Sequence, residues 1–375
     1  MGAGGNGVVR ATEKGFMNRQ HAPPPRSRSG VADYAVTLGR DLAKFGAPGV
    51  DLYHLGNNAL HAEIYGMALR KPGVIVLHDA VLHHFLLGQL TREKYVDEFV
   101  YNYGEWRRDL AQELWEARGS SGVDSRYFRY PMLKRIMANA RAVITHNAGA
   151  AEMAREHGDA GTPIHIIPHF IEAGPAPDHA DTARFRERLG VAQGTRLFGM
   201  FGYLRETKRV APTIRAFLRL NAVRPNTALL LAGEAVSGDL RRLLESEARH
   251  PAIHRLPHLS AEDLAVAAAA VDCCVNLRYP AAGETSGIAM RLMGIGKPVI
   301  MSAGPESAGL PKGAWLPVSQ GIAEGAELFE HMMVVTEFPR MGRDIGIEAR
   351  RHVLGRHALS AVAQEYWRVM CAAAS

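Results

Sequence analysis

Residues 272–302 read DCCVNLRYPAAGETSGIAMRLMGIGKPVIMS: a short, mostly apolar run, a loop with a Glu-Thr-Ser-Gly turn, a helix-like run and a second apolar run. A strand, a helix and a strand in this order form a parallel pair, because the helix returns the chain to the edge from which the first strand started. Near-continuous apolar character is typical of strands that are covered on both faces. The stretch therefore predicts an α/β unit with a parallel sheet.

The same alternation extends along most of the chain. Further strands are expected at 50–55, 73–79, 142–147, 164–169, 196–202, 228–234 and 252–257, with helices between them, one of which is a longer, more polar helix at 91–118. Residues 172–181, EAGPAPDHAD, have the composition of a linker. We therefore expect an α/β fold of two Rossmann-like, doubly wound domains, whose ligand binds outside the carboxyl ends of the strands in a cleft between them. The first domain is expected at residues 1–175 and the second at residues 185–338. Residues 339–375 are expected to form C-terminal helices that pack back on the first domain.

The composition narrows the class of protein. A length of 375 residues suits two domains. The formal charge of +6 is spread along the chain, which favours a phosphate-bearing ligand over nucleic acid. The three cysteines form no C-x-x-C pair, and no apolar run reaches the roughly eighteen residues that span a bilayer. We expect a cytoplasmic protein, for which peripheral contact with the inner membrane face stays open.

A first anion site is expected after the strand at 196–202. That strand ends in Gly202, where backbone N–H groups can approach an anion, and a helix start adds a partial positive charge. Arg205 and Lys208 follow, and together they could neutralise a diphosphate without a metal. Two solvated cations in a first helical turn are an equally good interpretation of these residues alone, because a Gly-rich strand end is a weak signal.

A second anion site is expected at the turn in the opening stretch. Thr285, Ser286 and Gly287 can present N–H groups at the next helix start, and Glu284 can accept hydrogen bonds from hydroxyl groups at the cleft rim. A simpler role for Glu284 is to stabilise the helix dipole, worth below about 1 kcal/mol. The matching anion site two strands earlier favours the functional interpretation.

The first half places His78 and Asp79 at the carboxyl end of the strand at 73–79. Histidine is suited to bond a sugar hydroxyl or to handle a proton near neutral pH, whereas Asp79 also fits a helix cap. His83 and His84 are interpreted as residues of a helix surface rather than metal ligands. No Asp-x-Asp pair occurs, so a divalent metal held by such a pair is not expected.

Taken together, these features resemble retaining glycosyltransferases of the GT-B fold, specifically glycosyltransferase family 4. The resemblance covers about residues 20–335. The stretches that carry it are SGVADY (29–34), YHLGNNALHAEIY (53–65), VIVLHDAVLHHF (74–85), FGYLRETK (201–208), LLLAGE (229–234) and YPAAGETSG followed by GKPVI (279–300).

The resemblance implies roles for single residues. Lys208 matches the lysine that holds the donor diphosphate, and Arg205 is the substitute for an arginine that many members have at the position of Tyr203. Glu284 matches the first acid of the family's paired-Glu motif, which contacts donor sugar hydroxyls, and His78 matches a histidine near the transferred sugar. Phosphate or sugar contacts are also implied for the loop residue Gly30 and for the turn residues Thr285, Ser286 and Gly287.

Two departures from the family pattern stand out. Arg291 occupies the place of the second acid, which usually grips the ribose; it could reach a ribose hydroxyl, a phosphate or Glu284, since the pair is spaced at roughly two helical turns. Between the helix at 32–46 and the strand at 50–55 a full-length member has a further strand and helix. The first domain is therefore expected to be shortened, with its acceptor side reduced or completed by another chain.

The expected activity is hexosyl transfer from a nucleoside-diphosphate sugar to an acceptor hydroxyl, with retention and without a metal or other cofactor. The acceptor could be a carbohydrate, a lipid-linked group or a small molecule, a homo-oligomer is an option, and no nucleic acid partner is expected. A non-catalytic nucleotide-sugar-binding or scaffold protein and a GT-B epimerase remain as alternatives. A dehydrogenase is a weaker alternative, because no strand precedes GAGGNG at residues 2–7.

Overall fold

The computed structural model describes residues 19–25, 27, 29–46, 48–172 and 177–375, so GAGGNG and part of the expected linker lie outside the described residues. The chain forms two units, and each draws on separate parts of the sequence. The first contains the described residues up to Phe170 together with Pro280–Thr285 and Leu359–Ser375; the second contains Ile171–Tyr279 and Ser286–Ala358. The short segment Pro280–Thr285, which carries Glu284, thus belongs to the first unit although the chain on both sides of it belongs to the second.

The first unit is built on a parallel sheet with the strand order β1-β2-β3-β4-β5. Its strands are β1 (Gln20–His21), β2 (Leu52–Leu55), β3 (Val74–Leu77), β4 (Ala142–Thr145) and β5 (Ile164–Ile166). Its helices are α2 (Gly30–Leu42), α3 (Ala62–Arg70), α4 (His83–Gln89), α5 (Arg92–Tyr103), α6 (Arg108–Glu116), α7 (Lys134–Ala138), α8 (Ala148–His157) and α16 (Leu359–Ala374).

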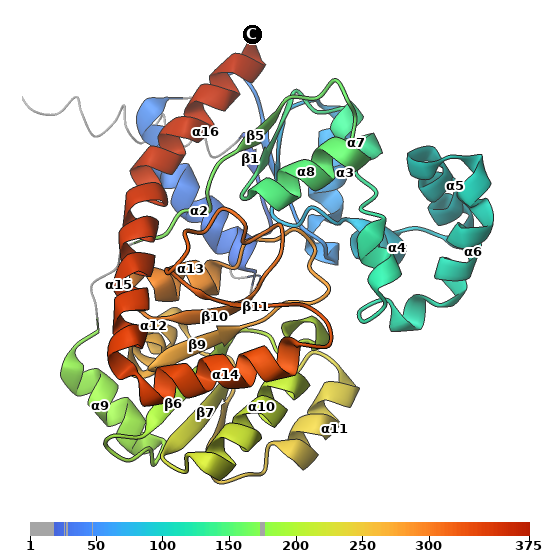
Figure 1. The fold of residues 1–375 in the computed structure, drawn as a ribbon. Helices are drawn as coiled ribbons and strands as arrows, with labels where there is room; N and C mark the ends of the chain where they lie inside the picture. The colour runs from blue at the N-terminus through green and yellow to red at the C-terminus, as the bar shows by residue number, and fades with distance from the viewer. Residues whose placement is uncertain (1–18, 26, 28, 47, 173–176) are drawn as a thin grey trace, which may run out of the picture. The chain divides into compact units, whose positions relative to one another are not determined.

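Side chains of the first sheet point alternately into two apolar clusters, because successive residues of a strand face opposite sides. One cluster joins Ile75 and Leu77 of β3 to helices α3 to α7. The other joins Val74 and Val76 of the same strand to α2 and α16. Figure 1 shows α2 and α16 beside each other, and the two are in direct contact. The unit is therefore a sheet covered on both faces.

The second unit repeats this design with a parallel sheet of order β11-β10-β9-β6-β7-β8. Its strands are β6 (Arg196–Phe201), β7 (Thr227–Ala232), β8 (Ile253–Leu256), β9 (Cys273–Asn276), β10 (Val299–Ser302) and β11 (Leu316–Val318). Its helices are α9 (His179–Arg188), α10 (Val210–Val223), α11 (Gly238–Glu247), α12 (Ala261–Ala270), α13 (Gly287–Gly294), α14 (Glu324–Glu337) and α15 (Pro339–Arg356). One apolar cluster lies under α10, α11 and α14, and the other under α9, α12, α13 and α15.

The opening stretch forms the strand–helix–strand unit that its sequence predicts. Strand β9 leads to helix α13, and strand β10 then pairs with β9 in parallel register, with Val299 opposite Cys274. Helix α13 starts at Gly287, capped by the Ser286 side chain, which accepts a hydrogen bond from the Ala289 amide. Glu284 therefore precedes the helix, and the two-turn helical spacing expected between Glu284 and Arg291 does not apply.

Three local features differ from what the sequence suggests. The long helix expected near residues 91–118 is interrupted after α5, because Gly104 has a φ of +90° that a regular helix does not allow. His83 is fully buried and not on a helix surface, since its ring bonds to Tyr95 and the Tyr130 backbone. Finally, α15 belongs to the second unit and α16 to the first, so the two C-terminal helices do not form one body.

Within the described ranges, no helix combines the length and the apolar character that crossing a bilayer requires.

Candidate functional site

Four histidines lie at one edge of the first sheet. His54 is near the carboxyl end of β2, His78 and His146 directly follow β3 and β4, and His169 lies beyond β5. Carboxyl ends of parallel strands meet at the same edge, and in open α/β sheets this is the edge where ligands bind. The histidines are thus gathered by topology from positions far apart in the sequence.

Three of these histidines form a hydrogen-bonded chain. The Nδ1 of His54 is 2.9 Å from the Nε2 of His78, and the Nδ1 of His78 is 3.3 Å from the Nε2 of His146. The Nδ1 of His146 is 3.0 Å from the backbone oxygen of Ile167. A carbonyl oxygen only accepts, so the Nδ1 of His146 carries the hydrogen. In a neutral ring its Nε2 then accepts, which assigns the Nδ1 hydrogen to His78 and, by the same step, to His54.

Gln20 closes the far end of this histidine chain (His54, His78 and His146). Its Nε2 donates to the Nε2 of His54 and to the backbone oxygen of Ala35, both at 2.9 Å. The Ala35 carbonyl requires a donor, so it fixes the amide orientation and confirms that the Nε2 of His54 accepts. Backbone carbonyls thus terminate the chain at both ends, and one hydrogen per ring accounts for every bond in it.

Burial keeps His54 and His78 uncharged. Burial lowers the pKa of His78 well below its usual value, and the nearby His146, His54, His169 and His61 lower it further. The pKa of His54 falls to about 3, again mainly because of burial. Tyr34 packs edge-on against His78 with ring centroids 4.9 Å apart. In this arrangement both ring nitrogens of His78 are engaged, so a proton or a hydroxyl from a ligand would displace one of the two bonds.

The segment Pro280–Thr285 lies beside this edge of the first sheet. The amides of Ala80 and Val81 donate to the Ala282 oxygen at 2.7 and 3.1 Å, directly after His78 and Asp79. The Oε2 of Glu284 accepts from the Ala282 amide at 2.7 Å. Gly283 has a φ of +77°, and a Cβ atom there would lie 2.6 Å from that of Ala80, so glycine is required.

Asn147, which lies between β4 and α8, contacts the same segment. Its Nδ2 donates to the Gly283 oxygen and to the Thr285 hydroxyl, each at 2.9 Å. The Thr285 hydroxyl therefore accepts from the protein, whereas the phosphate contact expected for Thr285 involves its backbone N–H group. The structure thus brings together His78, Glu284 and Thr285 within the first unit, and it adds Asn147, which the sequence interpretation missed.

Gly30, the remaining expected site residue of this unit, is exposed at the start of α2, after Ser29. No atom lies within 4 Å of the position that a Cβ at residue 30 would take. The position is therefore the first turn of a helix rather than a loop.

In the second unit, Lys208 lies at the carboxyl end of β6. Its Nζ donates to the Phe201 oxygen at 2.8 Å and lies 3.1 Å from the position that a Cβ at residue 202 would occupy. Gly202 has a φ of +79°, so glycine both permits this turn and makes room for the ammonium group. Arg205 is exposed one turn earlier, just before the short helix η6 (Glu206–Lys208). The expected pair of cations is thus at a strand end.

Hydrogen bonds connect the residues that follow β9 to the loop after β6, to the end of β10 and to the start of α13. The Tyr279 amide donates to the Thr207 oxygen at 2.7 Å, and the Arg278 amide donates to the Ser302 hydroxyl at 2.9 Å. Asn276, at the end of β9, donates to the Ser286 hydroxyl at 2.6 Å.

The expected site residues of α13 share the second unit with Lys208. Ser286 is the N-cap of this helix, Gly287 is its first residue, and Arg291 is exposed further along it. The expected residues are therefore divided, with Lys208, Arg205, Ser286, Gly287 and Arg291 in the second unit and the others in the first.

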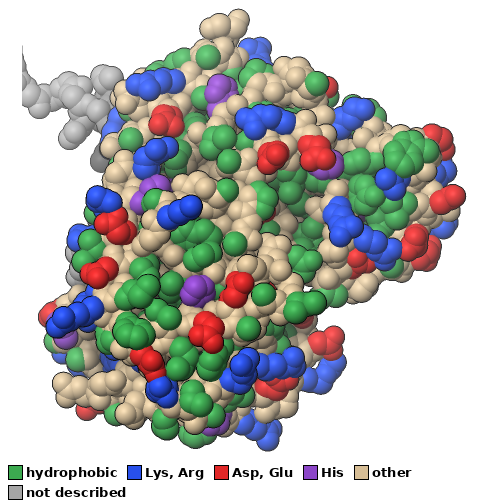
Figure 2. Space-filling view, viewed as in Figure 1, with side chains coloured by type: hydrophobic (Ala, Val, Ile, Leu, Met, Phe, Trp, Pro, Cys, Tyr) green, Lys and Arg blue, Asp and Glu red, His purple; other side chains and the backbone are tan. Residues whose placement is uncertain are grey.

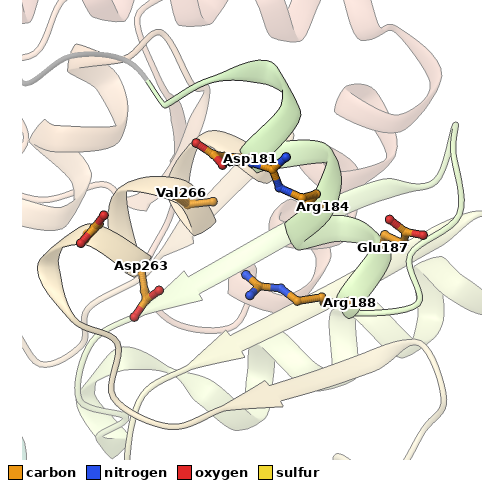
Figure 3. A pocket seen from close by; sticks show the side chains of 7 residues that line it. Asp181, Arg184, Glu187, Arg188, Asp263 and Val266 are labelled. Carbon is orange, nitrogen blue, oxygen red and sulfur yellow. Dashed lines mark hydrogen bonds and ion pairs between the residues drawn. The ribbon is translucent and has the colours of Figure 1, made fainter.

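A surface pocket of about 460 Å³ lies elsewhere in the second unit, between α9 and α12. Figure 3 shows Asp181, Arg184 and Arg188 of α9 on one side of it and Asp263 of α12 on the other. None of the expected site residues lines it. Figure 2 shows cationic and anionic side chains interspersed over the visible face rather than gathered by sign. Among the described residues, no three His, Cys, Asp or Glu side chains are arranged to hold a metal ion.

Comparison with solved structures identifies the architecture. The chain resembles Anabaena HepE, solved with UDP and glucose, with a TM-score of 0.59 and 16% identity over 83% of this chain and 80% of HepE. It resembles WaaG, a glycosyltransferase involved in lipopolysaccharide biosynthesis, with a TM-score of 0.63 and 14% identity over 94% of this chain and 98% of WaaG. It also resembles sucrose-phosphate synthase of Thermosynechococcus elongatus, with a TM-score of 0.58 and 18% identity over 92% of this chain and 79% of the synthase.

These likenesses show the fold. The chain consists of two Rossmann-like units with parallel sheets and has the GT-B fold, as the sequence resemblance predicts. No protein-family model matches the sequence, and no curated protein matches it with significant similarity.

Proposed function

We propose that this protein is a retaining glycosyltransferase of family 4, which transfers a hexosyl group from a nucleoside-diphosphate sugar to an acceptor hydroxyl without a metal. The observation that carries the proposal is the position of Lys208. Its ammonium group lies over a glycine turn at the carboxyl end of β6, which is the ligand-binding edge of an open α/β sheet. HepE, which has the same fold, has been solved with UDP-glucose.

Charge neutralisation is the chemical basis of the proposal. Breaking the bond between sugar and diphosphate leaves negative charge on the leaving phosphate, and fixed cations and helix N-termini stabilise such charge. Lys208 and Arg205 supply the cations, and the backbone at the start of α13 supplies N–H groups. These groups take the role that a metal has in other transferases.

The half-buried Glu284 is the proposed contact for the donor sugar. Its segment follows the edge of the first sheet at Ala80 and Val81, next to His78. A carboxylate that accepts from sugar hydroxyls orients the donor, so we assign Glu284 a binding and orienting role and not that of a nucleophile. Retention then follows from a same-face attack assisted by the leaving phosphate, as is usual for this family.

The structure also favours one alternative, a GT-B protein that binds a nucleotide-sugar without transferring it. Both ring nitrogens of His78 are already bonded to other histidines, so His78 offers no free basic nitrogen. A GT-B epimerase is less favoured, because it needs additional acids for its proton transfers and none of the described residues has been assigned to that role.

A binding screen followed by a transfer assay tests the proposal. Thermal unfolding is measured with UDP, GDP, ADP, dTDP and their sugars; a ligand that binds only the folded protein raises the midpoint. The donor that binds is then incubated with candidate hydroxyl acceptors, with and without EDTA. Transfer that EDTA does not reduce, and that Glu284→Gln reduces sharply, supports the proposal. Binding without transfer or isomerisation supports the scaffold, isomerised donor supports the epimerase, and no binding by any nucleotide overturns all three.

A further inference from the structure

We propose that Asn147 is a positioning residue for Glu284. Its side-chain amide donates to the Gly283 oxygen and to the Thr285 hydroxyl, both at 2.9 Å. These two acceptors belong to the residues on either side of Glu284. The bonds from Asn147 therefore hold the backbone before Glu284 and the side chain after it.

Two further contacts of the segment lie on the N-terminal side of the residues that Asn147 holds. The amides of Ala80 and Val81 hold the Ala282 oxygen, which fixes the segment before the turn. The Glu284 carboxylate accepts from the Ala282 amide, a bond within the segment. Asn147 adds two side-chain hydrogen bonds that join Gly283 and Thr285 to the carboxyl end of β4.

Asn147 is itself held in one orientation. Its Oδ1 accepts from the Ala150 amide at 2.7 Å and so caps helix α8. Because a backbone amide only donates and a backbone carbonyl only accepts, the oxygen must face the helix and the nitrogen must face Gly283. The preceding residue, His146, is part of the buried histidine chain. The donor is thus fixed on a rigid element, as a positioning group requires.

A helix cap alone would need only the oxygen, and this separates the two roles. Asp and Ser are good N-cap residues, so Asn147→Asp and Asn147→Ser preserve the cap while removing the NH₂ donor. Thr285→Val removes one acceptor at nearly constant volume. Asn58→Asp is a matched control, because Asn58 also caps a short helix, at the Leu60 amide, on an exposed loop of the same unit.

Hydrogen–deuterium exchange on the full-length protein tests the positioning directly. We expect the peptide covering 280–285 to exchange at least tenfold faster in both Asn147 variants, with a smaller change in Thr285→Val. Exchange in α8 and in Asn58→Asp should match the unmodified protein. Unchanged exchange at 280–285 would overturn the proposal, and so would equally faster exchange throughout α8, since that would make Asn147 a cap only.

The catalytic consequence rests on the proposed function, whereas the exchange test does not. With a transferable donor, Asn147→Asp and Asn147→Ser should lower kcat on the order of 10- to 100-fold, because a small misplacement of an orienting group has effects of this size. The affinity for the bare nucleoside diphosphate should stay within twofold, since Lys208 and Arg205 belong to the second unit. Faster exchange at 280–285 with unchanged kcat would overturn the positioning role, whereas faster exchange in a protein that transfers no sugar would count against the proposed function alone.

Discussion

The two sheets have the same parallel design, but their carboxyl edges carry opposite kinds of chemistry. In the first unit, His54 and His78 are buried, paired with each other and neutral. In the second, Lys208 is partly exposed, Arg205 is exposed, and both are cations in the second unit's loop after β6. Water access decides the difference, because an ionisable group that is buried among like groups stays uncharged. The fold thus supplies positions, and local burial determines whether they carry charge.

The largest effect is expected from low pH, which should lower the free energy of unfolding through the buried histidines of the first unit. Buried histidines whose pKa lies below that of the unfolded chain take up protons only on unfolding, so stability is complete above about pH 6.5 and falls as the pH drops toward 3. His54, His78 and His83 should each contribute a loss of about 1.4 kcal/mol per pH unit. Urea unfolding between pH 7.5 and 5 measures the slope, before most carboxylates titrate. A free energy of unfolding that is constant over this range would contradict the neutral state of His54 and His78.

Breaking the histidine chain should have the next largest effect. His146→Ala leaves the His78 Nδ1 hydrogen and the Ile167 oxygen without partners and opens a cavity, at a cost of about 2–4 kcal/mol. Urea unfolding at pH 7.5, followed by tryptophan fluorescence, gives the value. His165→Ala, a half-buried histidine of β5, is the control and should cost below about 1 kcal/mol. Equal losses in the two variants would show that the chain adds nothing specific.

Removing the cation at the second edge should weaken ligand binding rather than stability. Under the proposed function, Lys208→Met lowers the affinity for the nucleoside diphosphate by about 10- to 100-fold, the range for one charge-assisted hydrogen bond. Titration calorimetry with the nucleotide found in the screen measures it. Lys312→Met removes an exposed lysine of the same unit and should leave the affinity unchanged. If Lys208→Met binds as well as the control, the edge is not the diphosphate site.

The smallest effect is expected for Arg205. Its side chain is exposed, and an exposed charge contributes about 0.2–1 kcal/mol and is screened by salt. Arg205→Met should therefore weaken nucleotide affinity less than about fivefold, and the difference should shrink in higher salt. A loss as large as that of Lys208→Met would instead assign Arg205 a direct, desolvated contact with the phosphates.

The architecture could be predicted from the sequence because it depends on local patterns. The apolar runs at 73–79 and 142–147 contain the buried strands β3 and β4, and Gly202 marks the strand end beside Lys208. The histidine chain could not be predicted, because His54, His78 and His146 are brought together only by strand order. A weak signal exists, since His78 and His146 each follow an apolar run by one residue.

The direction of the hydrogen bonds is even harder to predict from the sequence than the histidine chain itself. No pattern in the sequence indicates which ring nitrogen of His78 carries the hydrogen. The position of that hydrogen depends on the Ile167 carbonyl, which is two hydrogen bonds away through His146. The role of Asn147 is similar: the sequence shows a plausible helix cap, but the second contact depends on a segment more than a hundred residues away. Interactions of this kind follow from tertiary structure and not from propensity.

The membership of α16 in the first unit has a consequence for synthesis on the ribosome. Val362, Tyr366 and Met370 of this helix fill the same apolar cluster as Leu38 and Leu42 of α2. Chains are made from the N-terminus, so every residue of the second unit, through Ala358, leaves the ribosome before the first unit can cover α2. The half that begins first is therefore completed last. Until α16 has been synthesised, the nascent chain exposes the apolar face of α2, which a chaperone can recognise.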